Sequence, residues 1–515
     1  MATSPCRGTV PDNNTPPRFT RVLIANRGEI ALRIVRACRE AGLESVAVYS
    51  DSDRPSPFVH AADHAMGIGP SPANQSYLRI DKLLLAARDS GAGAIHPGYG
   101  FLAERADFAE AVEQAGLVFI GPPSAAIRAM GDKTEARRRM IAAGVLVVPG
   151  SEGPVTDTDA AGDEARRLGY PVLVKAVAGG GGRGMREVHR EADLEGAVVS
   201  AASEAEKAFG DPRVYLEKLI LRPRHIEIQI LADRERTIHL GERECSIQRR
   251  HQKVVEEAPS SAVDERIREA MGSAAVAAAD AVGYRGAGTC EFLLGEDGQF
   301  FFLEMNTRIQ VEHPVTEMVY GVDLVREQLH IAAGQLMSLP APPPSPRGWS
   351  IECRITSEDP ANSFLPSTGT ITYLRPPSGP GVRWDAGYEA GDAVTLHYDS
   401  LLAKLIVVAP TRQTAIDRME RALAELVIVG VSTNQAFLRR LLAHNDFRRG
   451  EIDIAFLERH PELASPPTDD ETELPAVILA ALLDAERRHA VRPSVADGGV
   501  SGSEWLRVAR REGLR

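Results

Sequence analysis

The chain has 515 residues, of which 43% are hydrophobic and 25% charged, and its formal net charge is -12. This is the composition of an ordinary globular protein of about three domains, and the acidic balance argues against nucleic acid or an anionic membrane as the main partner. The five cysteines lie far apart without a CxxC pair, so neither a zinc knuckle nor a disulfide framework is predicted.

Residues 1–17 are expected to form a disordered leader, because they contain neither a basic segment nor an apolar one of the kind that targets a chain for export. No run of about 18 apolar residues occurs, so no membrane-spanning helix is predicted. We expect a cytoplasmic protein with reduced thiols.

Residues 18–121 predict a Rossmann-like domain. An apolar run at 22–25, a helical pattern at 28–42 and a second apolar run at 45–50 form a βαβ unit. Its first turn lacks GxGxxG, so a dinucleotide site is not predicted. Further along, Gly98 and Gly100 flank Tyr99 in a turn that either lets a ligand approach the backbone or is a plain tight turn.

A linker region with a helical segment carrying Lys133 is expected over 122–147, and a second α/β unit over 148–219. Its centre is a strand with Lys175 followed by four glycines at 179–182 and Arg183. The exposed N–H groups and two cations suit phosphate oxygens, although the pattern is not a P-loop. We interpret the segment as a mobile lid over nucleotide phosphates; a flexible linker is the alternative.

A cationic group occupies 248–253, after strands predicted at 214–220 and 224–233. It consists of Gln248, Arg249, Arg250, His251 and Lys253. A charge run is usually a solvated face, but the interleaved polar residues close to an acidic hairpin favour an anion site.

That hairpin is predicted from two apolar runs joined at Asp297-Gly298, the strongest short-range signal for a two-residue turn. Pairing 296 with 299 places Glu291 opposite Glu304, with side-chain roots about 5 Å apart. Two facing carboxylates repel, so they need a shared proton or a cation.

Asn306 adds a third oxygen on the same face as Glu304. Oxygen ligands of this kind suit Mg²⁺ or Mn²⁺ better than Zn²⁺. The alternative is an accidental pair of carboxylates splayed into solvent.

Every even position from 304 to 312 is polar, and an extended backbone would line these side chains up on one face. They are Glu304, Asn306, Arg308, Gln310 and Glu312. Periodicity alone also allows an amphipathic strand with a solvated face.

The last folded region is expected over 346–460, with a strand carrying Arg354 and helices at 411–426 and 434–443. Residues 461–515 form an extension with two weakly predicted helices, at 474–489 and 503–512. No function is assigned to this extension beyond a hypothetical contact with a partner subunit.

Residues 18–460 resemble biotin carboxylase, the ATP-dependent subunit or domain of biotin-dependent carboxylases. The resemblance rests on segments that occur in the family's order: ANRGEIALRI, HPGYGFLAE, MGDK, KAVAGGGGRGMR, YLEK, RHIEIQ, QRRHQKVVEEAP, GAGTCEFL, EMNTRIQVEHPVTE, ECRITSED and HYDSLLAK. It implies a mixed α/β and α+β protein of ATP-grasp fold. The N-terminal Rossmann-like domain would be followed by a mobile glycine-loop lid at 148–219, an ATP-grasp core at 220–345 and a C-terminal biotin carboxylase domain at 346–460.

The reaction that the resemblance implies joins ATP, bicarbonate and biotin through carboxyphosphate, with Mg²⁺ or Mn²⁺. No Met-Lys-Met biotinylation motif occurs. Biotin is therefore expected on a separate biotin carboxyl carrier protein, with separate carboxyltransferase subunits. A homodimer is expected, as is the first half-reaction of an acyl-CoA carboxylase, acetyl-CoA being the expected acceptor in fatty acid biosynthesis.

The resemblance also assigns residues. Magnesium is expected at Glu291, Glu304 and Asn306. ATP is expected to contact Lys133, Lys175, Gly181, Gly182, Glu217, Lys218, Leu219, Ile220, His225, Gln248, His251, Glu291 and Glu304. Bicarbonate is expected at Lys253, Arg308, Gln310, Val311 and Glu312, with Glu312 as the base. Biotin is expected at Tyr99 and Arg354, and the catalytic set is Arg308, Glu312, Lys253 and Arg354.

Two departures and two rival interpretations accompany the resemblance. Ala178 stands where many relatives have glycine, and Leu146 where proline is common. A different ATP-grasp ligase, such as carbamoyl-phosphate synthetase, is one rival; a non-catalytic nucleotide-binding module is the other. Arg354 and the turn at 96–100 favour biotin over ammonia, and the presence of Glu312, Lys253 and the metal ligands favours catalysis.

Overall fold

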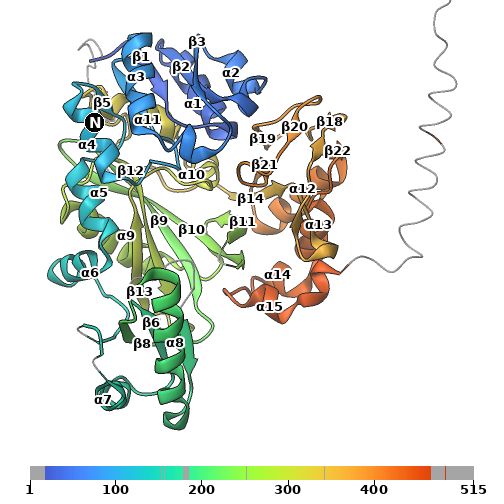
Figure 1. The fold of residues 1–515 in the computed structure, drawn as a ribbon. Coiled ribbons are helices and arrows are strands. Elements are labelled where there is room, and N and C mark those ends of the chain that lie inside the picture. Colours follow the sequence, from blue (N-terminus) through green and yellow to red (C-terminus); the bar gives the residue numbers. More distant parts are fainter. Residues whose placement is uncertain are drawn as a thin grey trace, which may run out of the picture. The chain divides into compact units, whose positions relative to one another are not determined.

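The computed structural model describes residues 18–151, 153–155, 157–177, 185–250, 252–340, 343–465 and 482. The chain divides into two compact units, 1–464 and 465–515, and the account below concerns the first (Figure 1). The expected leader, Gly181, Gly182, His251 and, apart from Leu482, both helices expected in the extension lie outside the described residues. No helix of the described part is both long and apolar enough to cross a membrane.

A five-stranded parallel sheet in the order β3-β2-β1-β4-β5 carries the expected βαβ unit. Val22, Leu23 and Ile24 are fully buried, as in a parallel sheet covered on both faces. The elements are β1 Arg21–Ile24, α1 Gly28–Glu40, β2 Glu44–Ser50, α2 Pro57–Ala61, β3 His64–Gly69, α3 Ile80–Ser90, β4 Ala94–His96, α4 Ala106–Gln114 and β5 Val118–Phe119.

The turn after β4 is held by Asn26, whose amide donates to the carbonyls of Pro97 and Tyr99, each at 2.7 Å. Gly98 has φ +63°, and a Cβ there would lie 2.9 Å from the Asn26 amide nitrogen. Glycine therefore lets the turn close against Asn26. The turn carries Tyr99 to the cavity described below.

A small three-stranded antiparallel sheet, in the order β7-β6-β8, lies within residues 148–219, the range expected to form the lid, and has two helices, α7 and α8, beside it (Figure 1). Its own apolar core includes Val172, Val174 and Leu216. Its elements are α7 Thr158–Leu168, β6 Val172–Ala176, β7 Met185–Val188, α8 Leu194–Phe209 and β8 Val214–Lys218, and the segment before it contains α5 Ser124–Gly131 and α6 Lys133–Ala142.

An eight-stranded antiparallel sheet forms the centre, in the order β13-β12-β9-β10-β11-β14-β21-β19. It runs from residues 220–345, the range expected to form the ATP-grasp core, into residues 346–460, so both ranges contribute to one sheet. Its elements and the helices around it are β9 Arg224–Ala232, β10 Thr237–Arg249, β11 Gln252–Ala258, α9 Glu265–Asp280, β12 Gly286–Leu294, β13 Phe300–Asn306, α10 His313–Tyr320, α11 Leu324–Ala332, β14 Trp349–Thr356, β19 Val382–Ala386 and β21 Leu401–Ala409.

The remaining C-terminal elements pack on the far end of this sheet. Thr411 caps α12 with a capping box, and Ile416, Met419 and Leu423 bury its inner face. The elements are β15 Glu358–Asp359, β16 Leu365–Pro366, β17 Gly369–Thr370, β18 Tyr373–Arg375, β20 Ala393–Val394, α12 Arg412–Glu425, β22 Val427–Val429, α13 Gln435–Ala443, α14 Asn445–Arg449 and α15 Phe456–Arg459.

The hairpin β12–β13 pairs Glu291 with Glu304, as predicted, but by a different route. The prediction of a two-residue turn was wrong. Gly295 N–H donates to the Gln299 carbonyl at 2.8 Å, so the loop between the strands has three residues. Gly298 takes the left-handed conformation that such loops require, with φ +77°. An irregularity between the Glu291 and Phe292 pairings then shifts the register by one and brings the carboxylates opposite each other.

Of residues 304–312, which periodicity alone left open as a strand, only those up to Asn306 are extended, because β13 ends there. Residues 307–312 form bends and a turn, and Glu312 is the N-cap of α10. Pro314 lies in the first turn of that helix, where its missing N–H costs nothing. The turn places Arg308, Gln310 and Glu312 along the cavity wall instead of along one strand face.

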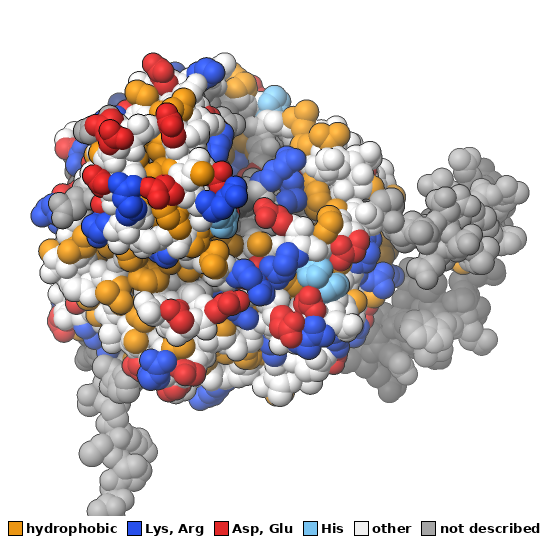
Figure 2. Space-filling model, turned by 90° about the horizontal axis from the view of Figure 1, so that it is seen from below, with side chains coloured by type: hydrophobic (Ala, Val, Ile, Leu, Met, Phe, Trp, Pro, Cys, Tyr) orange, Lys and Arg blue, Asp and Glu red, His pale blue; other side chains and the backbone are white. Residues whose placement is uncertain are grey.

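Acidic and basic side chains alternate on the face drawn in Figure 2, around a recess. Surface pairs such as Arg138 with Glu135, 2.7 Å apart, are exposed, and pairs of this kind contribute little to stability. The stronger electrostatic interactions lie inside, around the cavity.

Candidate active site

A cavity of about 600 Å³ beside the central sheet collects most of the predicted site residues. Those that line it are Tyr99, His225, Gln248, Lys253, Glu291, Glu304, Asn306, Arg308, Gln310, Val311, Glu312 and Arg354. The other described candidates are Lys133 in α6, Lys175 and Glu217 in the lid sheet, and Lys218, Leu219 and Ile220 at the end of β8; they do not line it.

Glu291 and Glu304 face each other on β12 and β13, at one end of the cavity. Removal from water and the charges of Glu291 and Glu104 raise the pKa of Glu304, and the positive charges of His225 and Lys133 only partly oppose this rise. The carboxylate pair therefore has an excess of negative charge at Glu304. A divalent cation with a preference for oxygen, such as Mg²⁺, fits that excess.

The side chain of Asn306 is not oriented as a third metal ligand would be, although the sequence predicted that role. Its side-chain nitrogen donates to Glu291 at 2.7 Å, and its oxygen accepts from Arg308 at 3.1 Å. Asn306 therefore connects the carboxylate pair to Arg308, and its oxygen must leave Arg308 before it can bind a cation.

Replacing Glu304 by glutamine should raise the free Mg²⁺ concentration needed for half-maximal ATP cleavage at least tenfold, about 1.4 kcal/mol of lost cation binding. Gln keeps the shape of the side chain and removes its charge. The measurement is ATP cleavage against free Mg²⁺. Glu296→Gln, at the exposed hairpin turn, is the control and should leave the Mg²⁺ dependence unchanged. An unchanged dependence in Glu304→Gln contradicts the cation assignment.

Lys253 lies at the centre of three carboxylates. Its ammonium contacts Glu227, Glu291 at 3.1 Å and Glu312 at 2.7 Å. Burial alone would lower the pKa of Lys253, but these three charges raise it well above its ordinary value. The residue is therefore a permanent cation that joins the metal end of the cavity to Glu312.

His225 is a second buried cation at the metal end. Its Nε2 lies 3.0 Å from Glu291 and 3.3 Å from Glu227. Burial lowers the pKa of His225, yet the charge of Glu291 and hydrogen bonds to both carboxylates raise it to about 9. A protonated imidazole on the cavity wall suits a phosphate oxygen.

A layer of charge beneath the cavity floor was missed by the sequence interpretation. Arg243 is fully buried and contacts Glu227 at 3.2 Å. It also donates to Gln229 at 2.7 Å, to Thr316 and Thr289 at 3.0 Å, and to Gln310. The alternation of Glu227 and Gln229 with isoleucines on β9 was a usable signal, since it marks a polar face on a strand that turns out to be buried on both sides.

Arg308 enters the cavity from the bend after β13. Its Nε lies 3.0 Å from Glu104, a residue with no distinctive sequence signal, and Glu104 also accepts from the Thr307 N–H at 3.3 Å. Glu104 thus fixes the bend from a different domain, 204 positions earlier than Arg308 in the chain. The guanidinium is held with donors beside Asn306, where an oxyanion can bind.

Arg354 connects Glu312 to the C-terminal part of the sheet. It donates to Glu256 at 2.6 Å and lies 3.0 Å from Glu312. Burial alone would raise the pKa of Glu312, but Lys253, followed by Arg354, lowers it below its ordinary value despite the nearby charge of Glu227. Glu312 is therefore a carboxylate at neutral pH.

Tyr99 and Val311 are tied together below the cavity by two residues that were also missed. The Tyr99 hydroxyl donates to Glu29, and Glu29 pairs with the fully buried Lys404 at 3.0 Å. Lys404 in turn donates to the Val311 carbonyl at 2.7 Å. This chain of contacts holds the Val311 peptide in place from the N-terminal and C-terminal domains at once.

The lid candidates form their own group. Lys175 on β6 pairs with Glu217 on β8 at 2.8 Å, and Glu217 raises the pKa of Lys175 although burial opposes it. Lys218 is bound to the carbonyls of Gly169 and Tyr170 at 2.8 and 3.1 Å.

Lys133 and Gln248 are the two remaining described candidates for ATP binding. Lys133 begins α6, and its positive charge acts on Glu304. Gln248 lines the cavity, with its amide donating to the Cys245 carbonyl at 2.9 Å.

Three family models match the chain in succession. A biotin carboxylase N-terminal domain matches residues 18–127, the ATP-binding domain of the carbamoyl-phosphate synthase L chain matches 132–339, and a biotin carboxylase C-terminal domain matches 352–459. The ATP-binding domain is therefore of a kind found in both ligases, while the flanking domains belong to biotin carboxylases.

Curated relatives and solved structures agree with the family models. The biotin carboxylase of Haemophilus influenzae is 52% identical over 441 residues, which cover 85% of this chain and 98% of the relative. A pyruvate carboxylase subunit of Methanothermobacter thermautotrophicus is 51% identical over 443 residues, covering 86% and 90%. The biotin carboxylase domain dimer of Hydrogenobacter thermophilus 2-oxoglutarate carboxylase, solved with MgADP, ADP and bicarbonate, has a TM-score of 0.82 at 47% identity, covering 87% and 99%.

Proposed function

Because the chain belongs to the biotin carboxylase family of ATP-dependent ligases with the ATP-grasp fold, we propose that it carboxylates the biotin of a separate carrier protein in this cavity. The observation that supports the proposal most is the row Lys253, Glu312 and Arg354 on the wall that continues from the Glu291–Glu304 pair. Nucleophile and phosphate can then lie side by side.

The first step is the activation of bicarbonate. Lys253, Arg308 and Gln310 offer donors to its oxygens, and the Val311 peptide is held in place by Lys404. Glu312, already ionised, accepts the bicarbonate proton as one bicarbonate oxygen bonds to the γ-phosphorus and ADP leaves. Carboxyphosphate is the product of this step.

The cavity contributes positive charges in fixed positions to this step. Mg²⁺ bound at Glu291 and Glu304 supplies charge neutralisation at the phosphates. Lys253 and His225 are cations of the protein itself, positioned before ATP arrives, so they need no reorganisation as charge develops. We assign Lys133, Lys175, the glycine loop with Gly181 and Gly182, Gln248 and His251 to the ATP phosphates and ribose, and Glu217 to Ile220 to the adenine side.

The second step transfers the carboxyl group to biotin. Carboxyphosphate releases CO₂ and phosphate, the phosphate takes the ureido proton, and the resulting biotin enolate attacks CO₂. Arg354 lies within reach of Glu312 and lines the same cavity, so it can balance the enolate charge. Tyr99, held by Glu29, borders the biotin side.

Free biotin should stimulate bicarbonate-dependent release of ADP by the purified chain. At high concentration the free vitamin can act as substrate in place of carrier-bound biotin. The measurement is a coupled ADP assay with and without biotin and bicarbonate. Ammonia is the control for the rival ligase. Stimulation by ammonia and not by biotin would overturn the proposed function.

The partner proteins are also proposed from membership of the family. We assign the chain to a carboxylase that contains a separate biotin carboxyl carrier protein and a carboxyltransferase, and to a homodimer, since a solved relative of 47% identity is a dimer. For the acceptor we propose an acyl-CoA, acetyl-CoA first. Relatives of similar identity are named for pyruvate and 2-oxoglutarate, so co-purified carboxyltransferase subunits are the test.

A further inference from the structure

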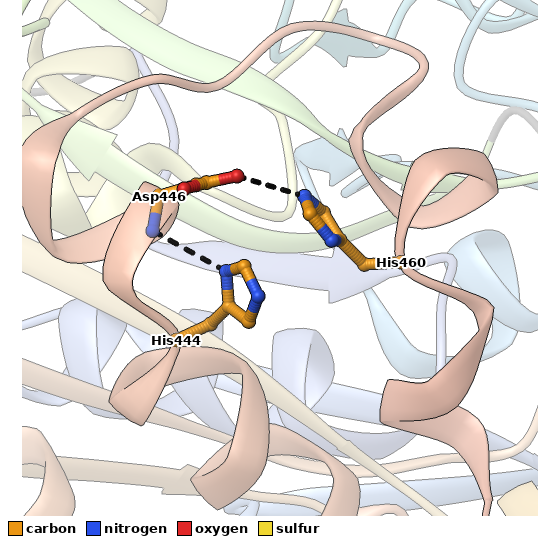
Figure 3. A group of neighbouring side chains, drawn as sticks. All are labelled: His444, Asp446 and His460. Atoms are coloured by element: carbon orange, nitrogen blue, oxygen red, sulfur yellow. Dashed lines mark hydrogen bonds and ion pairs between the residues drawn. The ribbon is translucent and has the colours of Figure 1, made fainter.

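Two histidines and an aspartate converge at the C-terminal end of the first unit, on none of the cavity walls (Figure 3). His444 follows α13, Asp446 lies in the first turn of α14, and His460 follows α15. One ring nitrogen from each histidine and one carboxylate oxygen lie within 4.8 Å of one another. Nothing in the carboxylation chemistry uses these three side chains.

The hydrogen-bond pattern sets which nitrogen of each ring carries a lone pair. His444 Nδ1 accepts from the Asp446 N–H at 3.3 Å, so its proton is on Nε2. His444 Nε2 and His460 Nδ1 lie 4.0 and 3.3 Å from the same oxygen of Glu462. His460 Nε2 faces a carboxylate oxygen of Asp446, whereas His444 Nδ1 faces the backbone N–H of the same residue, as the dashed lines in Figure 3 show.

The contact between His460 and Asp446 is close without being a good hydrogen bond. His460 Nε2 and Asp446 Oδ2 are 3.1 Å apart, yet Nε2 is buried and makes no aligned hydrogen bond. Two ligands at about 2.0–2.1 Å on a tetrahedral ion lie roughly 3.3 Å apart, which is the separation of this pair to within a few tenths of an ångström. Both atoms are thus placed to share a third atom between them.

The surroundings hold the three side chains in this arrangement. The rings of His444 and His460 are 4.2 Å apart at 50°, and Phe456 packs against both, at 5.9 and 4.8 Å. The other oxygen of Asp446 accepts from Arg449, which leaves Oδ2 for an ion. Carboxylates that accept the distal N–H of metal-bound histidines are the usual outer support of such sites, and Glu462, 3.3 Å from His460 Nδ1, is the carboxylate placed for that role.

We propose that His444 Nδ1, His460 Nε2 and Asp446 Oδ2 bind one divalent transition-metal ion of the zinc type, with water in the remaining position. Two imidazoles and one carboxylate suit Zn²⁺, Ni²⁺ or Co²⁺, whereas Mg²⁺ prefers oxygen alone. The long hydrogen bond from the Asp446 N–H to His444 gives way to the ion when it binds. The ion then ties the corner between α13 and α14 to the segment after α15, the last part of the first unit. The competing description is a cluster of hydrogen bonds and ion pairs without a metal.

Zinc titration of the full-length chain tests the proposal, after chelator treatment and in excess Mg²⁺ and ADP to occupy the ATP site. The parent should bind one equivalent of Zn²⁺ that is lost in His460→Phe, which keeps the ring against Phe456, and in His444→Asn, which keeps a cap for α14. Affinity should fall at least about 100-fold in both and about 10- to 100-fold in Glu462→Gln. Co²⁺ should give visible bands of a nitrogen- and oxygen-bound ion in the parent and not in the two histidine variants.

A matched control is His189→Asn, an exposed histidine 3.4 Å from Glu187 without a second imidazole. It should bind zinc like the parent. Basal ATP cleavage should be unchanged in all four variants, which shows that they are folded and keeps this test separate from the proposed function. Equal zinc binding by the parent, His460→Phe and His444→Asn overturns the proposal, as does a parent that binds no zinc under these conditions.

Discussion

Replacing Glu312 by glutamine is expected to slow bicarbonate-dependent ATP cleavage by about 10²- to 10⁴-fold, the range for loss of a general base. Lys253, at 2.7 Å, and Arg354, at 3.0 Å, keep Glu312 ionised, and glutamine can hydrogen bond to both but cannot take a proton. The measurement is ADP release at saturating ATP and bicarbonate, so the effect should fall on kcat.

Glu358→Gln is the matched control for this prediction. Glu358 lines the same cavity but pairs with Arg249, at 3.1 Å, and accepts from Ser400 at 2.9 Å. Its loss should change ADP release only a few-fold. Parent-like kcat in Glu312→Gln would remove Glu312 from the proton transfer.

Replacing Arg243 by methionine is expected to lower the free energy of unfolding by about 3–5 kcal/mol, the cost of removing one member of a buried group of paired charges. Arg243 and Glu227 are both fully buried, and methionine fills much of the volume without supplying donors. Gln310 also loses the guanidinium that holds its oxygen, so bicarbonate affinity should fall with stability. Urea denaturation followed by tryptophan fluorescence measures the first effect.

Two comparisons make the Arg243 prediction specific. Arg105→Met removes an exposed pair, with Asp107 at 2.6 Å, and should cost less than about 1 kcal/mol. Adding Glu227→Gln to Arg243→Met should not recover the lost stability, because Glu227 also pairs with Lys253 and His225, and these two buried cations then lose a carboxylate. A cost in Arg243→Met no larger than in Arg105→Met would contradict the role of the buried pair.

Part of the site could be predicted from local sequence patterns. The facing of Glu291 and Glu304 followed from two apolar runs around a turn, because strand pairing in a hairpin is set by neighbours in the chain. The prediction that these two residues face each other was confirmed even though the loop is one residue longer than predicted, because the irregularity beside Glu291 restores the register. The parallel sheet of the N-terminal domain was predictable for the same reason: each strand, helix and turn carries its own local signal.

The sequence by itself therefore determined the elements, the facing carboxylates and, through the resemblance, the family. Only the tertiary structure decided where β13 ends and which partners Arg308, Lys253 and Val311 have. Those partners are Glu104, Glu227 and Lys404, which come from other strands and domains. Periodicity records which side of a strand is polar, but whether that side meets water or another buried charge depends on what packs over it, and that contact is made between residues far apart in the chain.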